Sequence, residues 1–563
     1  MSVATPTSTP AATPAATDAN SGAATRASAK AASLSLVTVL AVALILGGFA
    51  TLAWVTRTPG VTHSNDDALY MLLGDQLTHF SYRELFKVGA PRHGQYPPLW
   101  PALLGLTQLL TGGSETARFL LVTVLMTAAL ALFFDLCRRL LPQWLAVVVL
   151  LGAACNPFTI NFGGRVMSEA AFLFWSMLCL WALQRARGHE TSRRFLRLAA
   201  GAALAAALTR TIGLTLLAGV ICAWLLERRW RPAFTLSGVT AVFVGGWLAW
   251  TLLHHEGVAG RSYVADAAQV TQDRSVGLGT SSPVVAMARK VALRVRLQLT
   301  DLVPSGLVPH RRGDSLDNVV WLAVTLLLGA FGAAAYWRLL PSAILYVVFY
   351  CGLLSVWPWA PRRFFVPLQP IVLLGFVLGV LELKRIWRPM ARYGQLVAAA
   401  LVAVVLSASV PQVFANARQG LAMRSGGALD VPCLLQRRSA RLLWCGRLCA
   451  RLAPRTARFL VEREAAFAYH TRRIVQHAQA PLHLSDPDFR AYLAKAHIEY
   501  IVLSRLTESE VLGVAPKLLS NCEYLAPVRR FAPTGRIYRV LSVSAPAFEN
   551  ACADLSRLQA LPQ

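Results

Sequence analysis

Long runs of apolar residues alternate with short polar segments over most of the chain. The first uncharged run extends from Ala31 to Val55, and others follow it to about residue 411. An α-helix needs about 20 such residues to cross a hydrocarbon core about 30 Å thick. We therefore predict eleven membrane-spanning helices, at about residues 31–55, 119–134, 143–162, 170–184, 198–209, 211–226, 233–253, 319–337, 340–357, 364–381 and 393–411.

The polar segments between these runs indicate an orientation in the membrane. Every second segment is basic, from Arg138-Arg139 to residues 384–392. The positive-inside rule places these segments in the cytoplasm, together with the N-terminus. The segments that then face outside are 56–118, the turns near 165 and 210, 254–318 and 358–363. The run 198–226 could be one long helix around Arg210 or two short ones, and two keep both of its basic flanks inside.

The two ends of the chain have other patterns. Residues 1–30 are rich in Ala, Thr, Ser and Pro, which predicts a disordered cytoplasmic tail. Strand-like runs occur within 412–563, at 459–461, 500–503 and 537–541, with helical stretches such as 488–496 between them. The fold class expected is a polytopic α-helical membrane protein of 31–411 with a small extracytoplasmic α/β domain at 412–563.

Composition supports a membrane protein and argues against a nucleic-acid partner. Of the 563 residues, 55% are hydrophobic and only 15% are charged, although the formal net charge is +27. The arginines flank apolar segments, and no basic helix or aromatic-interleaved basic stripe is present. Membrane topology and attraction to anionic lipid head groups explain such a charge distribution.

The ten cysteines divide evenly between the apolar and the C-terminal parts. An extracytoplasmic location of the C-terminal part would permit one or two disulfides and leave one thiol over. Cys445 and Cys449 are spaced i, i+4, but no histidine neighbours them, so the pattern favours no metal site there. The C-terminal cysteines are Cys433, Cys445, Cys449, Cys522 and Cys552.

An acidic pair, Asp66-Asp67, follows the first apolar run by about ten residues. Near an apolar surface, one of two repelling carboxylates can have a raised pKa, which suits a general base. One side chain could face a site while the other caps a following helix, predicted at Ala68–Phe86. Both could equally be a helix cap at a wet loop.

A second acid, Glu169, stands four residues after Arg165 at the outer end of two predicted spans. The two could form an ordinary interfacial salt bridge. Alternatively, Arg165 faces an anion and Glu169 assists the acid–base pair or a metal, because charges at a membrane edge are costly and often functional.

Three further arginines lie at predicted outer turns, where the positive-inside rule gives them no topological role. Arg210 is at one turn and the pair Arg362-Arg363 is at another. Guanidinium groups match phosphate bidentately, which suits a lipid phosphate, although the same side chains could snorkel to head groups.

The first outer loop ends in the sequence His93-Gly94-Gln95-Tyr96-Pro97-Pro98. His93, Gln95 and Tyr96 could bind a polar head group. The prolines and aromatic residues could also simply end the loop and anchor it at the interface.

The order of these features resembles the membrane glycosyltransferases of the GT-C class, glycosyltransferase family 39-like. The likeness is to bacterial relatives of the protein O-mannosyltransferases and of the aminoarabinose transferase that modifies lipid A. It rests on short motifs that span most of the chain, which are, in order, Asp66-Asp67, Pro97-Pro98, Arg165 with Glu169, Thr209-Arg210 and the element from Trp357 to Pro367.

The resemblance implies an inverting transfer of a sugar from a polyprenyl phosphate donor to a lipid, glycan or protein acceptor, at the outer face of the cytoplasmic membrane. Asp66 would activate or bind the acceptor hydroxyl, with Asp67 in the second acidic position. Glu169 would help with the acceptor or a divalent metal, the one cofactor left open. Arg362 or Arg363 would neutralise the departing phosphate.

One departure from the family pattern concerns the acceptor. The lipid A transferase has Glu-Lys before its Pro-Pro, whereas this chain has Gln95-Tyr96. The difference weakens the hypothesis that lipid A is the acceptor, and it removes a candidate phosphate-binding lysine. Three alternatives remain: a lipid-carrier polymerase or ligase, a transporter, for which midplane charges or repeats would be expected, and a non-enzymatic scaffold.

Overall fold

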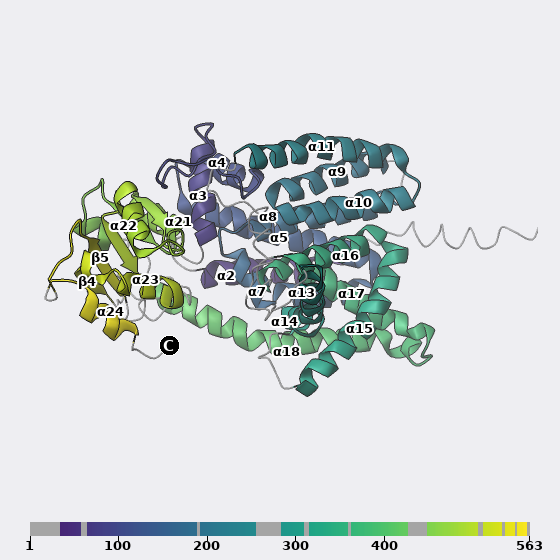
Figure 1. Cartoon of the computed structure of the whole chain (residues 1–563). Coiled ribbons are helices and arrows are strands. Elements are labelled where there is room, and N and C mark those ends of the chain that lie inside the picture. The colour runs from purple at the N-terminus through teal and green to yellow at the C-terminus, as the bar shows by residue number, and fades with distance from the viewer. Residues whose placement is uncertain are drawn as a thin grey trace, which may run out of the picture.

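A computed structural model of the chain describes residues 34–57, 65–187, 192–254, 283–308, 315–357, 362–425, 448–504, 510–531, 535–546 and 549–559. The described part is a helical bundle joined to a small α/β unit (Figure 1). The predicted tail 1–30 lies outside the described residues.

The bundle is built from the apolar segments seen in the sequence. Its elements are α2 (Leu36–Thr56), α3 (Asn65–Leu77), α4 (Leu99–Thr111), α5 (Glu115–Leu140), α6 (Gln143–Ala154), α7 (Pro157–Gly163), α8 (Ser168–Arg185), α9 (Ser192–Thr209), η1 (Thr211–Gly213), α10 (Leu214–Leu226), α11 (Trp230–Leu253), α13 (Pro283–Leu297), η4 (Gln298–Leu302), α14 (Val303–Leu307), α15 (Ser315–Leu339), α16 (Pro341–Val356), η5 (Arg362–Leu368), α17 (Gln369–Glu382), η6 (Leu383–Arg385) and α18 (Met390–Ser425).

Every predicted span coincides with helical structure, but fewer helices than predicted could cross a bilayer alone. Among the described residues, six helices are long and apolar enough, or seven if α6 and α7, bent by 66°, count as one span. α10 and α16 are apolar but short. The structure thus supports a multi-pass membrane protein and does not confirm the count of eleven.

The run 198–226 contains two helices rather than one. α9 ends at Thr209, and the 3₁₀ turn η1 leads into α10. A Cβ added at Gly213 would collide with the backbone of Ala206 and Ala207, so a side chain there would push η1 away from α9. The break leaves Arg210 at the turn between the two helices.

The first outer loop is more ordered than its sequence suggested. The helix predicted at Ala68–Phe86 begins earlier, at Asn65, and ends at Leu77. Phe80 then takes a left-handed backbone conformation (φ 55°), which reverses the chain. α3 and α4 pack so closely that a Cβ at Gly105 would collide with the backbone of Gly74. The long loop expected at 254–318 likewise contains helices, α13, η4 and α14, among its described residues.

The C-terminal part contains the predicted sheet. Its elements are β1 (Arg458–Val461), α21 (Glu464–Thr471), β2 (Ile474–His477), α22 (Asp486–Lys495), β3 (Tyr500–Leu503), η7 (Glu510–Val514), α23 (Ala515–Leu519), η8 (Cys522–Tyr524), β4 (Leu525–Phe531), β5 (Gly535–Val540) and α24 (Cys552–Gln559). The strand order is β2-β1-β3-β5-β4. β1 pairs in parallel with β2 and β3, and β5 is antiparallel to β3 and β4.

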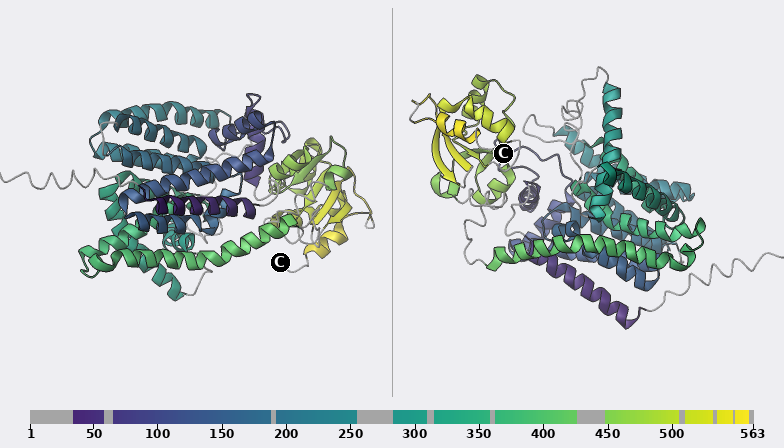
Figure 2. Two further views of the ribbon diagram at one scale, coloured as in Figure 1. Left: turned by 180° about the vertical axis from the view of Figure 1, so that it is seen from behind. Right: turned by 90° about the horizontal axis from the view of Figure 1, so that it is seen from below.

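A disulfide joins Cys522 to Cys552 and ties α24 to the sheet. Cys449 is a buried free thiol, and Cys433 and Cys445 lie outside the described residues. The last bundle helix, α18, extends to Ser425, well past the predicted end at 411, and reaches toward the α/β unit (Figure 2).

Candidate active site

Four charged side chains and one tyrosine, from five separate places in the chain, meet at the end of the bundle that faces the first loop. Asp66 is in the first turn of α3, and Tyr96 precedes α4. Glu169 is in the first turn of α8, Arg210 is at the α9–η1 turn, and Arg363 is in η5. Residues that are distant in sequence thus form one cluster of two carboxylates and two guanidinium groups.

Asp66 is the centre of one half of the cluster. Its Oδ2 is 2.6 Å from Nη1 of Arg363, and its Oδ1 accepts a 2.8 Å hydrogen bond from the Tyr96 hydroxyl. Asp67 points elsewhere, and its Oδ1 accepts from the backbone N–H of Ala68 at 2.9 Å. The adjacent carboxylates therefore diverge, with Asp66 directed to the cluster.

Glu169 and Arg210 form the other half. Glu169 Oε1 is 2.6 Å from Arg210 Nη1, and the Glu169 side chain is fully buried. Arg210 also donates to Ser168 Oγ at 3.1 Å, and that hydroxyl is 3.1 Å from the Tyr70 hydroxyl. The partner of Glu169 is therefore Arg210, and the salt bridge considered with Arg165 is not the one formed. The Arg165 guanidinium lies instead over the ring of Phe162, 5.5 Å from its centroid.

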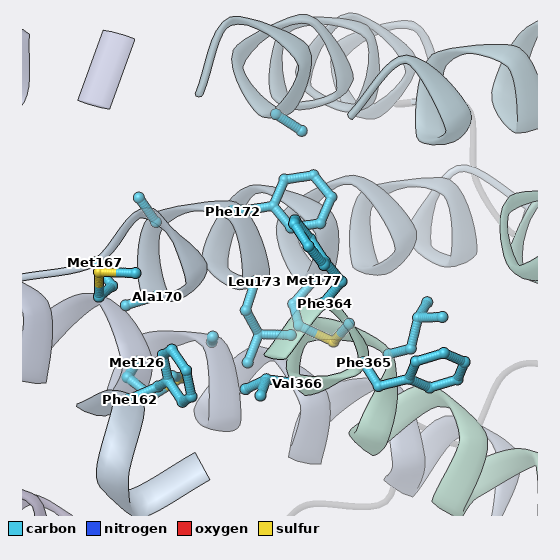
Figure 3. Close-up of a cluster of buried hydrophobic side chains, with 14 of the residues drawn as sticks. Met126, Phe162, Met167, Ala170, Phe172, Leu173, Met177, Phe364, Phe365 and Val366 are labelled. Atoms are coloured by element: carbon cyan, nitrogen blue, oxygen red, sulfur yellow. The ribbon is translucent and has the colours of Figure 1, made fainter. Parts of the chain in front are cut away.

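Phe364 joins the two halves. The guanidinium carbons of Arg210 and Arg363 lie 5.1 and 5.3 Å from the centroid of its ring, a distance at which cation–π attraction holds both cations. Beneath the charges, Phe364, Phe365 and Val366 pack with side chains of α8 in an apolar layer (Figure 3). This layer excludes water from one side of the cluster, which strengthens its electrostatic interactions.

A small cavity of about 20 Å³ opens between the two arginines. Tyr70, Tyr96, Trp357 and Thr209 contribute to its walls with the two arginines. A cavity of this size holds about one water molecule, so a larger group must displace side chains or ion pairs to reach the arginines.

The remaining predicted residues surround the cluster. Gln95 is buried beside Tyr96, and Arg362 belongs to η5, but its side chain lies outside the described residues. His93 is buried and uses both ring nitrogens: Nδ1 is 2.8 Å from Glu84 Oε1, and Nε2 accepts from the backbone N–H of Tyr96 at 2.9 Å. In this structure His93 supports the backbone of Tyr96 rather than facing the cavity.

Glu84 and Lys87, which the sequence did not single out, form a buried ion pair behind His93. Burial by itself raises the pKa of the Glu84 carboxyl. The hydrogen bond from His93 and the charge of Lys87 outweigh it and lower the pKa of Glu84 to about 2. Lys87 is also 3.8 Å from Glu464 of α21. The i, i+3 spacing of Glu84 and Lys87 was the available signal, but it is also common on exposed surfaces.

The α/β unit contacts the cluster through the residue next to Asp66. Asn65 Oδ1 accepts hydrogen bonds from the backbone N–H groups of Ala465 and Ala466, at 2.9 and 3.3 Å, and so caps α21. The backbone N–H of Val475 in β2 donates to the Phe86 carbonyl at 2.7 Å. Polar contacts from the α/β unit thus reach the segment that carries Asp66 and Tyr96 at two points, Asn65 and Phe86.

No group of three or more His, Cys, Asp and Glu side chains within the described ranges is arranged to hold a metal ion.

Part of the chain matches a known protein family. Residues 95–250 match the family model described as dolichyl-phosphate-mannose-protein mannosyltransferase. No curated protein sequence matches the chain.

Two solved structures are similar to the whole fold. The apo crystal structure of ArnT from Cupriavidus metallidurans has a TM-score of 0.52 at 12% identity, over 90% of this chain and 98% of ArnT. The Archaeoglobus fulgidus oligosaccharyltransferase, tethered with an acceptor peptide containing the NVT sequon, has a TM-score of 0.52 at 13% identity, over 89% of this chain and 74% of its own. At identities this low, the structural similarity establishes the fold alone. The chain is a multi-pass helical protein with the fold of the GT-C membrane glycosyltransferases.

Proposed function

We propose that the protein is an inverting glycosyltransferase that moves a sugar from a polyprenyl phosphate to an acceptor hydroxyl. The observation that supports this reading is the Asp66–Arg363 ion pair beside the buried Glu169–Arg210 pair. It supplies a base and two cations at one membrane edge. The name of the matching family includes dolichyl phosphate mannose, which is a donor of this chemical class.

The cluster provides what the transfer requires. As the bond between the anomeric carbon and the phosphate oxygen breaks, the electron pair goes to the phosphate, whose charge grows from about −1 to −2. Fixed guanidinium groups at Arg210 and Arg363 favour that charge more in the transition state than in the ground state. The acceptor oxygen attacks the opposite face of the anomeric carbon and transfers its proton to Asp66.

The resting ion pair gives the donor a second role. While Arg363 pairs with Asp66, the positive charge reduces the basicity of the carboxylate. A donor phosphate that competes for Arg363 releases Asp66 at the moment when the acceptor has to be deprotonated. On this mechanism donor binding precedes activation of the acceptor. In this proposal the cluster faces the outside of the cytoplasmic membrane, and the α/β domain lies on the same side.

The test is release of free polyprenyl phosphate. Purified protein in nanodiscs is given a panel of polyprenyl phosphate sugars, with lipid, glycan and peptide acceptors, and product is measured by mass spectrometry. We expect Asp66→Asn to abolish release while the fold is retained, because the change is isosteric. Asp486→Asn is the control: Asp486 also forms an ion pair, with Lys517 at 2.6 Å, but it lies in α22, away from the cluster. Wild-type release in Asp66→Asn would remove that residue from the mechanism, and failure to bind any of these lipids would refute the donor class.

A further inference from the structure

A groove with a volume of about 910 Å³ lies between α9, the α10–α11 turn and the start of α11. Five arginines line it: Arg193, Arg197, Arg228, Arg229 and Arg231. The rest of the lining is largely apolar and includes Leu204, Leu236 and Val239. The groove thus combines a basic rim with an apolar trough.

The groove is at the opposite end of these helices from the charged cluster. Arg193 and Arg197 are in the first turns of α9, whereas Arg210 follows its last residue. At about 1.5 Å per residue, the 16 residues from Arg193 to Thr209 separate the two ends by roughly 24 Å. α11 begins at the groove and ends near the first loop, where Trp250 Nε1 donates to the carbonyl of His93 at 3.1 Å. Figure 1 shows α9, α10 and α11 side by side.

The groove arginines differ from those of the cluster in their partners. Arg229 pairs with Glu227 at 3.2 Å. Among the residues that the structure describes, no carboxylate pairs with Arg193, Arg197, Arg228 or Arg231. Exposed guanidinium groups without a carboxylate are available to an anion, and their planar donors fit a phosphate.

The apolar trough has a feature that a simple basic surface lacks. Gly201 lines the groove on α9, and a Cβ added there would meet no atom within 4 Å. Trp230 lies at the rim and is half exposed, as is common for tryptophan at a membrane interface. An apolar trough that continues from a basic rim suits the hydrocarbon chain of a lipid.

We propose that this groove binds an anionic phospholipid of the leaflet opposite the candidate active site. The phosphate is held by Arg197, Arg228 and Arg231, and an acyl chain runs along Gly201 toward Leu204. Basic pockets between transmembrane helices recognise anionic head groups in this way. The positive-inside rule accounts for basic residues at this face, but it does not account for a trough that continues from them. The inference does not depend on glycosyl transfer.

Binding of the lipid head group is tested by removing positive charge from the groove. Native mass spectrometry of delipidated protein compares phosphatidylglycerol with phosphatidylcholine of the same acyl chains. We expect the wild type to bind phosphatidylglycerol at least tenfold more tightly, and Arg197→Gln with Arg231→Gln to lose that preference. Arg388→Gln with Arg392→Gln is the matched control, since both arginines are exposed near the same end of the bundle but do not line the groove. Equal losses in the two double variants, or no preference in the wild type, would overturn the proposal.

Binding of the acyl chain in the trough is tested by a substitution that does not change the charge. Gly201→Leu fills the trough, and Gly238→Leu on α11 is its control, because a Cβ at Gly238 also meets open space outside the groove lining. Leucine is a better helix former than glycine, so neither variant should unfold. We expect Gly201→Leu to weaken phosphatidylglycerol binding at least fivefold and Gly238→Leu to leave it unchanged. Wild-type affinity in Gly201→Leu would refute the groove as the site.

Discussion

The two ends of α9–α11 use arginine in opposite ways. At one end Arg210 and Arg363 pair with Glu169 and Asp66, at 2.6 Å each. At the other end, arginines line an open groove and most have no described carboxylate partner. The residue type is the same, but the Arg210 and Glu169 side chains are only 9% and 0% exposed, whereas most of the groove arginines are exposed.

The physical reason is the cost of desolvation. A guanidinium out of water needs a countercharge, and removing one partner of a buried pair leaves the other uncompensated. An exposed guanidinium keeps its hydration and can exchange water for a phosphate at little cost. The guanidinium groups of the charged cluster (the paired end) are therefore held in place by their carboxylates, whereas those of the groove are available to bind a phosphate.

The largest expected effect comes from breaking the buried pair. Glu169→Gln leaves Arg210 as an uncompensated buried charge and should cost about 3–5 kcal/mol of the free energy of unfolding. Glu382→Gln is the exposed counterpart, since Glu382 pairs with Arg338 and with Arg385, whose side chain is 58% exposed; it should cost about 1 kcal/mol or less. Steric trapping in bicelles measures both. Equal costs would contradict the distinction between the two kinds of pair.

Replacing one arginine by alanine at each end should weaken the binding of a different lipid. Arg363→Ala should weaken binding of a polyprenyl phosphate about tenfold or more, the effect of losing a charge-assisted hydrogen bond, and leave phosphatidylglycerol binding unchanged. Arg231→Ala should do the reverse. Isothermal titration with each lipid measures the four affinities. If both variants weaken the binding of both lipids, the two ends are not independent.

A smaller effect is expected from the contact that holds the paired end to the α/β unit. Asn65→Ala removes the cap of α21 and should destabilise that helix by about 1 kcal/mol, whereas Asn65→Ser should retain most of the cap. Hydrogen exchange at Ala465 and Ala466, and at α3, reports the change. Ser485→Ala removes the cap of α22 and should leave exchange at α3 unaltered. Faster exchange at α3 in that control would mean that the contact through Asn65 is not specific.

A further expected effect is a pH dependence of the free energy of unfolding, which comes from Glu84. Since the pKa of Glu84 in the folded protein is about 2, below its ordinary value of about 4.3, the ionised carboxyl stabilises the fold fully above pH ~4.5. That stabilisation is lost as the pH falls from there toward 2. Glu84→Gln should therefore make the free energy of unfolding depend less on pH in that window. An unchanged slope would show that other carboxyls account for the acid loss.

The sequence by itself determined the membrane class, the positions of the apolar helices and three of the five strands of the C-terminal sheet, β1, β3 and β5. It did so because hydrophobic length and period-2 patterning are local properties. It also pointed to Asp66, Glu169, Arg210 and Arg363, since charges at membrane edges are costly enough to stand out.

The partners of these charges were decided only by the tertiary structure. Arg165 is four residues from Glu169, but the helix start directs Glu169 to Arg210, 41 residues later in the chain. α3 ends early, at Leu77, three residues before the left-handed Phe80, and the contact made by Asn65 depends on a helix about 400 residues away. The groove is likewise invisible in sequence, where its arginines are an ordinary basic flank, because a trough exists only between packed helices.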